Sequence, residues 1–245
     1  MYWNDYMWFL AAMLLCMVFS GIASSKVKSS FEKYNKSSCR SGMTGYDTVY
    51  RLMKSQGIYD ISIGSVSGFL TDHYHPNKRV VNLSQSTYSN SSVAAVAVAA
   101  HEVGHVMQRR DGYFMYRVRT ALVPIVNFSS RLAMPLVLLG LLLNFFVELA
   151  DPNTGFYIAM VGVVLYGGSL LFALVTLPVE LNASKRAREM LLSQGILSED
   201  EIPGAREVLS AAALTYLASL LASLVSFLRF LVYVLSIFGR RNNNR

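Results

Sequence analysis

Four stretches of the chain are apolar and free of charged residues, and polar segments separate them. They cover residues 6–23, 132–147, 156–179 and 208–228. A helix that crosses a bilayer needs roughly 20 apolar residues. Three of the stretches have about that length, and the second reaches it when the chain from Thr120 is included, with Arg131 near an interface. The pattern therefore predicts about four transmembrane helices in a mainly α, integral membrane fold.

The polar segment at 26–119 has the pattern of a small α+β domain. Thr44 and Gly57 are suitable caps for a short helix between them. Three short runs rich in strand-forming residues follow, separated by Gly/Ser or Pro-Asn turns. They cover residues 59–63, 68–72 and 79–83.

A longer helix is predicted from Val93 to about Arg110, after the capping residues Ser91 and Ser92. Its first half is almost entirely Ala and Val, and such small side chains let neighbouring elements approach closely. Charged residues follow too soon for a transmembrane span. We therefore expect a buried helix within the polar domain or at the membrane edge.

The composition supports a membrane protein, because 53% of the 245 residues are hydrophobic and only 15% are charged, against about 25% charged in soluble domains. The net charge is +7. Residues 26–54 alone hold seven basic and two acidic residues, a net charge of +5, which indicates a cytoplasmic flank that faces anionic lipids. The sequence has no basic stripe interleaved with aromatic residues, so we expect no nucleic-acid partner.

The N-terminal apolar stretch has two interpretations. Asp5 precedes it without any Lys or Arg, and the basic residues follow it, an order that favours a retained anchor with its N-terminus outside. Small residues around Ala23 would also suit a signal peptidase. A cleaved signal peptide is therefore the alternative.

The residues His101-Glu102-Val103-Gly104-His105 form the HEXXH pattern within the longer helix. Residues four apart share one face of a helix, so both imidazoles can point at one metal ion. Zinc fits, because it accepts two His nitrogens and a carboxylate and keeps a position for water, whose pKa it lowers to about 7. Glu102 would then take a proton from this water as general base. The motif predicts a zinc peptidase with one Zn²⁺ per chain.

A third zinc ligand must lie on the same side of the membrane as His105, so an even number of spans must separate the two residues. Glu180 follows directly after two predicted spans, at 120–147 and 156–179. The loop between these spans is acidic, and basic residues follow Glu180, as expected outside and inside a cell membrane respectively. Glu180 is therefore the expected third ligand.

Three other residues are candidates for the site. Glu148 is the main rival of Glu180, although it belongs to the opposite interface in this topology. His73 and His75 have a strand-like spacing that places both side chains on one face. Either could ligate zinc or stabilise the oxyanion, but such residues are more often surface groups.

Several separated segments together resemble one family. They lie at 70–74, 82–84, 92–95, 99–105 and 177–187. These segments, with the order of anchor, zinc helix, two spans, Glu motif and final apolar stretch, resemble the neutral zinc metallopeptidase family of membrane proteins (YugP-like). The resemblance covers most of the chain. It implies a gluzincin-like site with His101, His105 and Glu180 on zinc and Glu102 as base.

The segment after Glu180 also resembles the Glu-x-x-Ala-Asp motif of the heat-shock and prenyl-processing membrane zinc proteases. In those families the Asp supports a zinc-binding histidine through a hydrogen bond. Ser184 stands at that position here. The resemblance therefore leaves open whether this hydroxyl or another residue supports the histidine.

These patterns divide the chain into five segments. They are an N-terminal transmembrane anchor (1–25), a zinc-protease domain with the HEXXH helix (26–119), two transmembrane helices (120–179), a cytoplasmic Glu-motif segment that completes the zinc site (180–207), and a C-terminal hydrophobic helix or helices with a basic tail (208–245). The stretch 208–238, interrupted by Arg229, fits either one long span or a hairpin. The strand at 79–83 could pair with an extended substrate.

We expect a multi-pass protein of the cell membrane that acts as a zinc metalloendopeptidase near the cytoplasmic face. Its expected partners are the lipid bilayer, protein or peptide substrates that include membrane proteins, and other membrane proteins or a second copy of the chain. A membrane scaffold that keeps a zinc site without essential proteolysis is the alternative, but it would not need Glu102. A metal transporter would need ionisable residues within several spans, and only Arg131 and Arg229 qualify.

Overall fold

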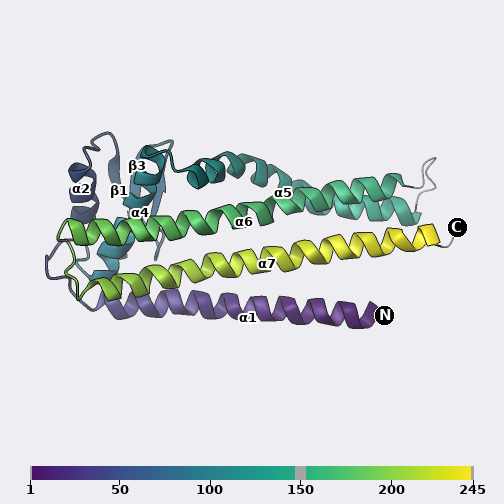
Figure 1. Cartoon of the computed structure of the whole chain (residues 1–245), viewed down its shortest axis with the longest axis horizontal. Coiled ribbons are helices and arrows are strands. Elements are labelled where there is room, and N and C mark those ends of the chain that lie inside the picture. The colour runs from purple at the N-terminus through teal and green to yellow at the C-terminus, as the bar shows by residue number, and fades with distance from the viewer. Residues whose placement is uncertain (1, 147–152, 244–245) are drawn as a thin grey trace. The chain divides into compact units, whose positions relative to one another are not determined.

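The computed structural model describes residues 2–146 and 153–243, which contain seven α-helices and three β-strands (Figure 1). In chain order these are α1 (Tyr2–Asn35), α2 (Gly45–Ser55), β1 (Ser62–Val66), β2 (His73–His75), β3 (Val80–Ser84), α3 (Gln85–Tyr88), α4 (Val93–Arg110), α5 (Phe114–Phe146), α6 (Thr154–Ser193) and α7 (Ile202–Asn243). The chain divides into two compact units, whose boundaries fall inside α1, α5, α6 and α7. The helical unit comprises Met1–Ser20, Val118–Thr176 and Leu217–Arg245, and the site unit comprises Gly21–Arg117 and Leu177–Tyr216.

Within the described residues, four helices are long and apolar enough to cross a membrane. Their candidate spans are Met7–Asn35, Phe114–Asn144, Thr154–Ser193 and Ile202–Phe238. Large apolar side chains on these helices are exposed, among them Leu15 and Met17 of α1, at 70% and 69%. Apolar surface of this extent is stable against lipid and not against water. The predicted fold, mainly α with about four membrane helices and a small α+β part, is confirmed.

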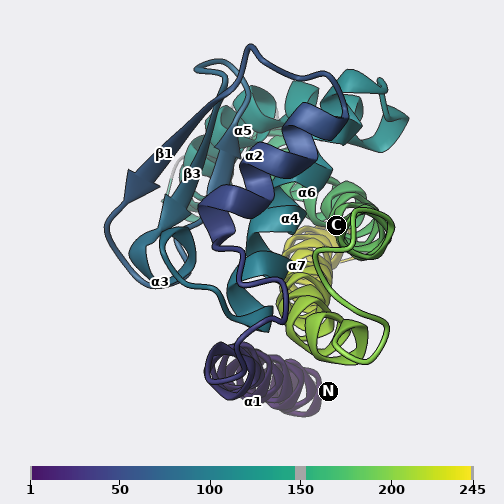
Figure 2. The same cartoon turned by 90° about the vertical axis from the view of Figure 1, so that its left-hand side faces the viewer.

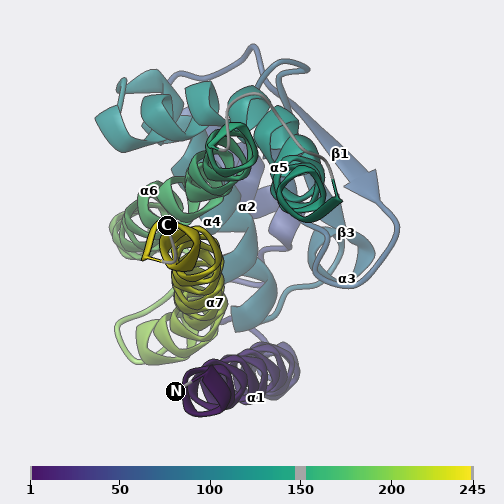
Figure 3. The same cartoon turned by 90° about the vertical axis from the view of Figure 1, so that its right-hand side faces the viewer.

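Small residues bring α5 and α6 together in the helical unit (Figure 3). A Cβ atom on Gly140 would lie 2.4 Å from the Gly155 carbonyl oxygen, and one on Gly162 would lie 2.6 Å from the Ala133 carbonyl oxygen. Larger side chains at these positions would separate the two backbones. α5 and α6 therefore pack closely by van der Waals contact, as helices in lipid commonly do.

The C-terminal segment forms one continuous helix, because α7 runs from Ile202 to Asn243. The hairpin alternative for residues 208–238 is therefore wrong. No Gly or Pro interrupts residues 205–238, so the sequence contains no signal that would turn the chain there. α1 likewise continues beyond the predicted anchor to Asn35, and its last turns belong to the site unit.

The site unit contains a three-stranded sheet in the order β1-β3-β2. β1 pairs in parallel with β3, with Ser62 opposite Val80, and β2 pairs antiparallel with β3, with Tyr74 opposite Val81. Both edges of β3 are thus occupied. An added strand needs a free row of backbone groups, so the expectation that residues 79–83 could pair with a substrate is wrong.

Two expected strands, at 59–63 and 68–72, are displaced toward the C-terminus and correspond to β1 and β2. A turn occupies most of the second expected strand. In this turn the Thr71 hydroxyl donates to the Ser67 carbonyl oxygen, and Leu70 has a left-handed φ of 53°. Hydrogen bonds between side chain and backbone compete in this way with strand pairing.

Helices α2 and α4 cover one face of the sheet (Figure 2). α2 begins with a capping box, in which the Thr44 hydroxyl accepts from the Asp47 amide and the Asp47 carboxylate accepts from the Thr44 amide. Fully buried apolar side chains fill the space between the helices and the sheet. They include Val49, Leu52, Val81, Leu83 and Val96. This core holds α4, the helix with the HEXXH residues, against the sheet.

Candidate metal centre

α4 is buried along most of its length. Ser92 caps its first turn by accepting a hydrogen bond from the Ala95 amide. At Gly104 the α6 backbone comes so close that a Cβ atom there would lie 2.6 Å from the carbonyl oxygen of Ala183. This approach brings the HEXXH face of α4 next to Glu180 on α6.

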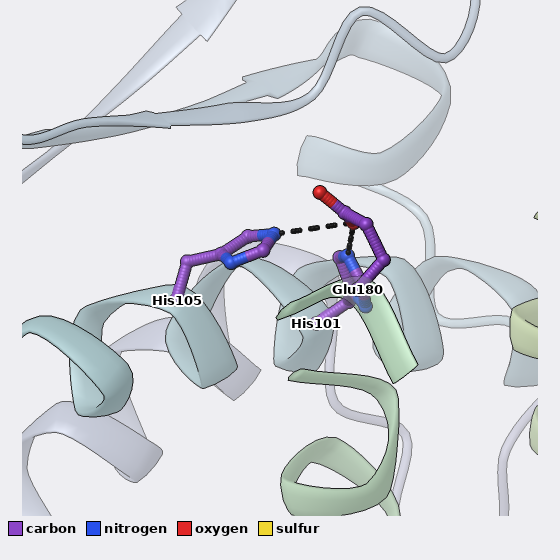
Figure 4. Close-up of side chains that lie close together, drawn as sticks. All are labelled: His101, His105 and Glu180. Atoms are coloured by element: carbon purple, nitrogen blue, oxygen red, sulfur yellow. Dashed lines mark hydrogen bonds and ion pairs between the residues drawn. The ribbon is translucent and has the colours of Figure 1, made fainter. Parts of the chain in front are cut away.

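His101, His105 and Glu180 form one cluster (Figure 4). The two imidazole rings lie edge to face, with centroids 4.8 Å apart. The Glu180 Oε2 atom lies 3.1 Å from His101 Nε2 and 3.5 Å from His105 Nε2. One potential ligand atom from each residue lies within 4.8 Å of the other two. A single ion could therefore contact all three side chains.

The chemistry of this cluster fits zinc. Two imidazole nitrogens and one carboxylate oxygen are the protein ligands of one class of zinc peptidase sites, which keep a fourth position open. Glu180 is only 2% exposed, and a buried carboxylate is costly without a positive partner. Burial lowers the pKa of His105, but the hydrogen bond and charge of Glu180 more than offset this effect and raise it overall. Glu180 thus attracts positive charge into the cluster.

A buried glutamine fixes the orientation of His105. The Gln108 side-chain amide donates to the Val179 carbonyl oxygen at 2.7 Å and to the Asn182 side-chain oxygen at 3.0 Å. The Gln108 carbonyl oxygen therefore faces His105 Nδ1, 2.9 Å away, and accepts a hydrogen bond from its N–H group. This tautomer leaves the lone pair on Nε2, the atom that faces Glu180.

His101 has a corresponding contact with α6. The Ser184 hydroxyl lies 3.1 Å from His101 Nδ1, while His101 Nε2 faces Glu180. Ser184 thus contacts the histidine from the position where the Glu-x-x-Ala-Asp motif has its aspartate. A hydroxyl oxygen can accept a hydrogen bond from the Nδ1–H group there and leave Nε2 available to a metal ion.

Polar contacts continue from the cluster toward the surface. The Arg186 Nε atom donates to the Asn182 side-chain oxygen at 3.0 Å. The Arg186 guanidinium also pairs with Asp111, the C-cap residue of α4. These contacts attach the end of α4 to α6 beyond the cluster.

Glu102, the expected base, is 7% exposed and lies beside the cluster. It lines a cavity of about 180 Å³ together with His101. Its carboxylate is not among the three grouped side chains of the described residues. A carboxylate that lies beside a metal site without binding the metal ion is free to accept a proton.

The structure does not bring the other candidate histidines into this cluster. A ring nitrogen of His73 contacts the Asn82 side chain, and His75 accepts a hydrogen bond from the Lys78 amide. Both histidines therefore interact locally around β2. The rival ligand Glu148 lies outside the described residues.

The chain is similar to known proteins over most of its length. Residues 8–235 match a family described as "Putative neutral zinc metallopeptidase". A protein of Bacillus subtilis (strain 168) named "Putative membrane protease YugP" is 43% identical over 221 residues, which cover 90% of this chain and 93% of that protein. No solved structure matches the chain.

Proposed function

The chain belongs to the neutral zinc metallopeptidase family, and on that premise we propose that it is a membrane-bound zinc endopeptidase whose active site lies near the cytoplasmic face. The observation that carries the proposal is the convergence of His101, His105 and Glu180, whose ligand atoms lie within 4.8 Å of one another. The residues come from two different helices. Their donor types are those of a zinc peptidase site.

The chemistry follows from the positions of these side chains. His101, His105 and Glu180 would hold one zinc ion per chain. Zinc bound there would supply a Lewis acid that polarises the peptide carbonyl and lowers the pKa of water. Glu102 accepts the proton of the attacking water and passes it to the leaving amine, a role supported by its place next to His101 in the wall of the same cavity.

The charge pattern supports a cytoplasmic site. The basic segment 26–54 lies entirely in the site unit, and basic residues also follow Glu180. Two candidate spans, in α5 and in the first part of α6, separate His105 from Glu180 along the chain. An even number of crossings returns the chain to the same side. The substrates we propose are proteins or peptides on that side, membrane proteins among them.

Zinc content and proteolysis of the detergent-purified full-length protein test this proposal. We expect about one zinc per chain in the wild type and in Glu102→Gln, and much less in His101→Ala, His105→Ala and Glu180→Ala. The wild type should cleave denatured casein in a chelator-sensitive manner, and Glu102→Gln should not. His73→Ala is the matched control and should keep both properties. Full zinc in Glu180→Ala would place the third ligand elsewhere.

The scaffold alternative predicts the opposite response to loss of the base. If the protein is a scaffold, every cellular role survives Glu102→Gln, because partner binding needs no proton transfer. If it is a peptidase, the roles that depend on cleavage are lost. A zinc-loaded protein that cleaves nothing in a broad screen of proteins and peptides would also favour the scaffold.

A further inference from the structure

A cavity beside the cluster has walls that the proposed chemistry does not use. Its volume is about 180 Å³, below the roughly 300 Å³ at which pockets for whole small ligands begin. Four elements of the site unit form its walls: the last turns of α1, the loop before β2, α4, and the first turns of α7. A space of this size suits one large side chain and not a whole ligand.

The cavity adjoins the candidate metal centre at His101. His101 and Glu102 both line it. Val98 continues this wall one turn earlier on α4, because residues three apart share a helical face. A peptide bond held for attack at the cluster would therefore place the side chain of an adjoining residue within reach of the cavity.

The walls opposite α4 are almost entirely apolar. An apolar wall recognises an apolar side chain, because contact removes both surfaces from water. The residues that form these walls are Val27 and Phe31 of α1 and Val208, Leu209, Ala212 and Tyr216 of α7, and the Tyr216 hydroxyl is their one side-chain polar group. Phe31 and Val208 are themselves packed in a buried cluster, so the walls are fixed in place.

The remaining wall is a loop in an unfavourable backbone conformation. Leu70 has a φ of 53°, which glycine adopts more readily than leucine. The loop is fixed on both sides of Leu70: the Phe69 ring packs edge-on against Phe31 with centroids 5.3 Å apart, and Asp72 accepts two hydrogen bonds from Ser84. Strained residues of this kind concentrate at binding sites, where the surrounding structure determines their conformation.

We propose that this cavity is the specificity pocket of the peptidase and takes a large aliphatic or aromatic side chain of the substrate residue next to the scissile bond. The inference rests on the proposed function and adds the class of residue that the site selects. Asp72 is a charged group in the wall, but each of its carboxylate oxygens already accepts a hydrogen bond from Ser84. The walls formed by α1 and α7 are almost entirely apolar, and a Lys or Arg charge would have to leave water to lie against them, so the pocket selects apolar side chains over Lys and Arg.

Cleavage-site mapping with the full-length, zinc-loaded protein tests the pocket. Denatured casein is digested, and the cut sites are identified by mass spectrometry. We expect large apolar residues to be preferred at least about tenfold over Gly and Ala at one position beside the cut. Ala212→Phe fills the cavity and should move this preference to small residues. Ser210→Phe places the same ring on α7 at an exposed position outside the cavity and should leave it unchanged.

The outcomes separate the two proposals. Cleavage without a positional preference, with a preference for Lys or Arg, or with an apolar preference that survives Ala212→Phe would overturn the pocket and leave the peptidase function standing. Absence of any cleavage would count against the peptidase function. The decision on the pocket would then rest on a binding measurement that needs no turnover.

Hydroxamate probes with an isobutyl or a methyl side chain supply that measurement. Their binding to zinc-loaded Glu102→Gln is compared by calorimetry. We expect the isobutyl probe to bind at least about tenfold more tightly, and this difference to disappear when Ala212→Phe is added but not when Ser210→Phe is added. Leu70→Ala enlarges the cavity, so a hydroxamate with a benzyl side chain should bind this variant more tightly than the isobutyl probe does. Equal binding of the isobutyl and methyl probes would overturn the pocket.

Discussion

Gly104 of α4 and Ala183 of α6 are in backbone contact. A Cβ atom on Gly104 would lie 2.6 Å from the Ala183 carbonyl oxygen and 3.1 Å from its Cα atom. Gly104 lies between the two histidines of the cluster, and Ala183 lies about one turn after Glu180. The contact therefore sets the distance between the imidazole pair and the carboxylate.

Gly104→Ala should weaken zinc binding. The added methyl group meets backbone atoms, which cannot rotate away, so the two helices must separate. We expect a loss of about tenfold or more in zinc affinity and of about 1–3 kcal/mol in stability. Competition with a fluorescent chelator measures the affinity. Gly168→Ala is the control, because a Cβ atom there would meet nothing within 4 Å. Wild-type affinity in Gly104→Ala would contradict the prediction.

Gln108→Leu should lower zinc affinity by about 10–100-fold. The substitution removes the acceptor of His105 Nδ1 and leaves the Val179 carbonyl oxygen without its side-chain donor. Isothermal titration of the metal-depleted protein with zinc measures the change. Gln85→Leu, at an exposed position on α3, should bind zinc like the wild type. If both variants do so, Gln108 does not orient the histidine.

Substitutions at Ser184 should change zinc affinity in opposite directions. Ser184→Ala removes the contact with His101 Nδ1 and should weaken zinc binding several-fold. Ser184→Asp supplies a carboxylate, which accepts a stronger hydrogen bond from the His101 Nδ1–H group than a hydroxyl does. This bond makes Nε2 a better ligand and should tighten zinc binding. Chelator competition at one fixed pH compares the two. Equal affinities in the two variants would show that this contact has no influence on the metal.

The ionised Glu201 carboxylate should stabilise the fold at neutral pH and lose this effect as the pH falls below its usual pKa of 4.5. Partial burial raises its pKa, but hydrogen bonds from Ser198 and Arg40 more than offset this effect and hold it below its usual value of 4.5. A carboxyl group with a lowered pKa in the folded state contributes stability above its unfolded pKa and loses it as the pH falls through the folded value.

Glu201→Gln should therefore cost about 1 kcal/mol at pH 7, and the difference from the wild type should vanish as the pH falls well below 4.5. Unfolding of the detergent-solubilised protein across this pH range measures both values. Glu199→Gln, close by on the same loop, is the control. A pH-independent difference would mean that the Glu201 charge does not contribute.

The elements with strong local signals are those that the sequence predicts well. α4 begins and ends at the predicted residues, Val93 and Arg110, because a capping serine and a run of Ala and Val specify a buried helix. The four candidate spans follow from length and hydropathy alone. Strand positions are less well predicted, because a turn closed by Thr71 competes with pairing where the residue types favour a strand.

Residues that act through long-range contacts could not be predicted in the same way. Gln108 lies three residues after His105, a spacing that places both on one helical face, and this spacing is the signal that the sequence offers. Its role depends on the carbonyl of Val179, more than seventy positions away. The cavity beside Glu102 is likewise built from four elements, whose meeting no local pattern specifies.

The chain order of the cluster has a consequence during synthesis. Ribosomes make His101 and His105 first, whereas Glu180 follows α5 and most of the apolar part of α6. A nascent chain that has not yet delivered these spans to the bilayer holds two of the three side chains. The three-residue cluster therefore becomes complete only after the candidate spans of α5 and α6 have been synthesised, so a chain that is truncated or stalled before Glu180 cannot assemble it.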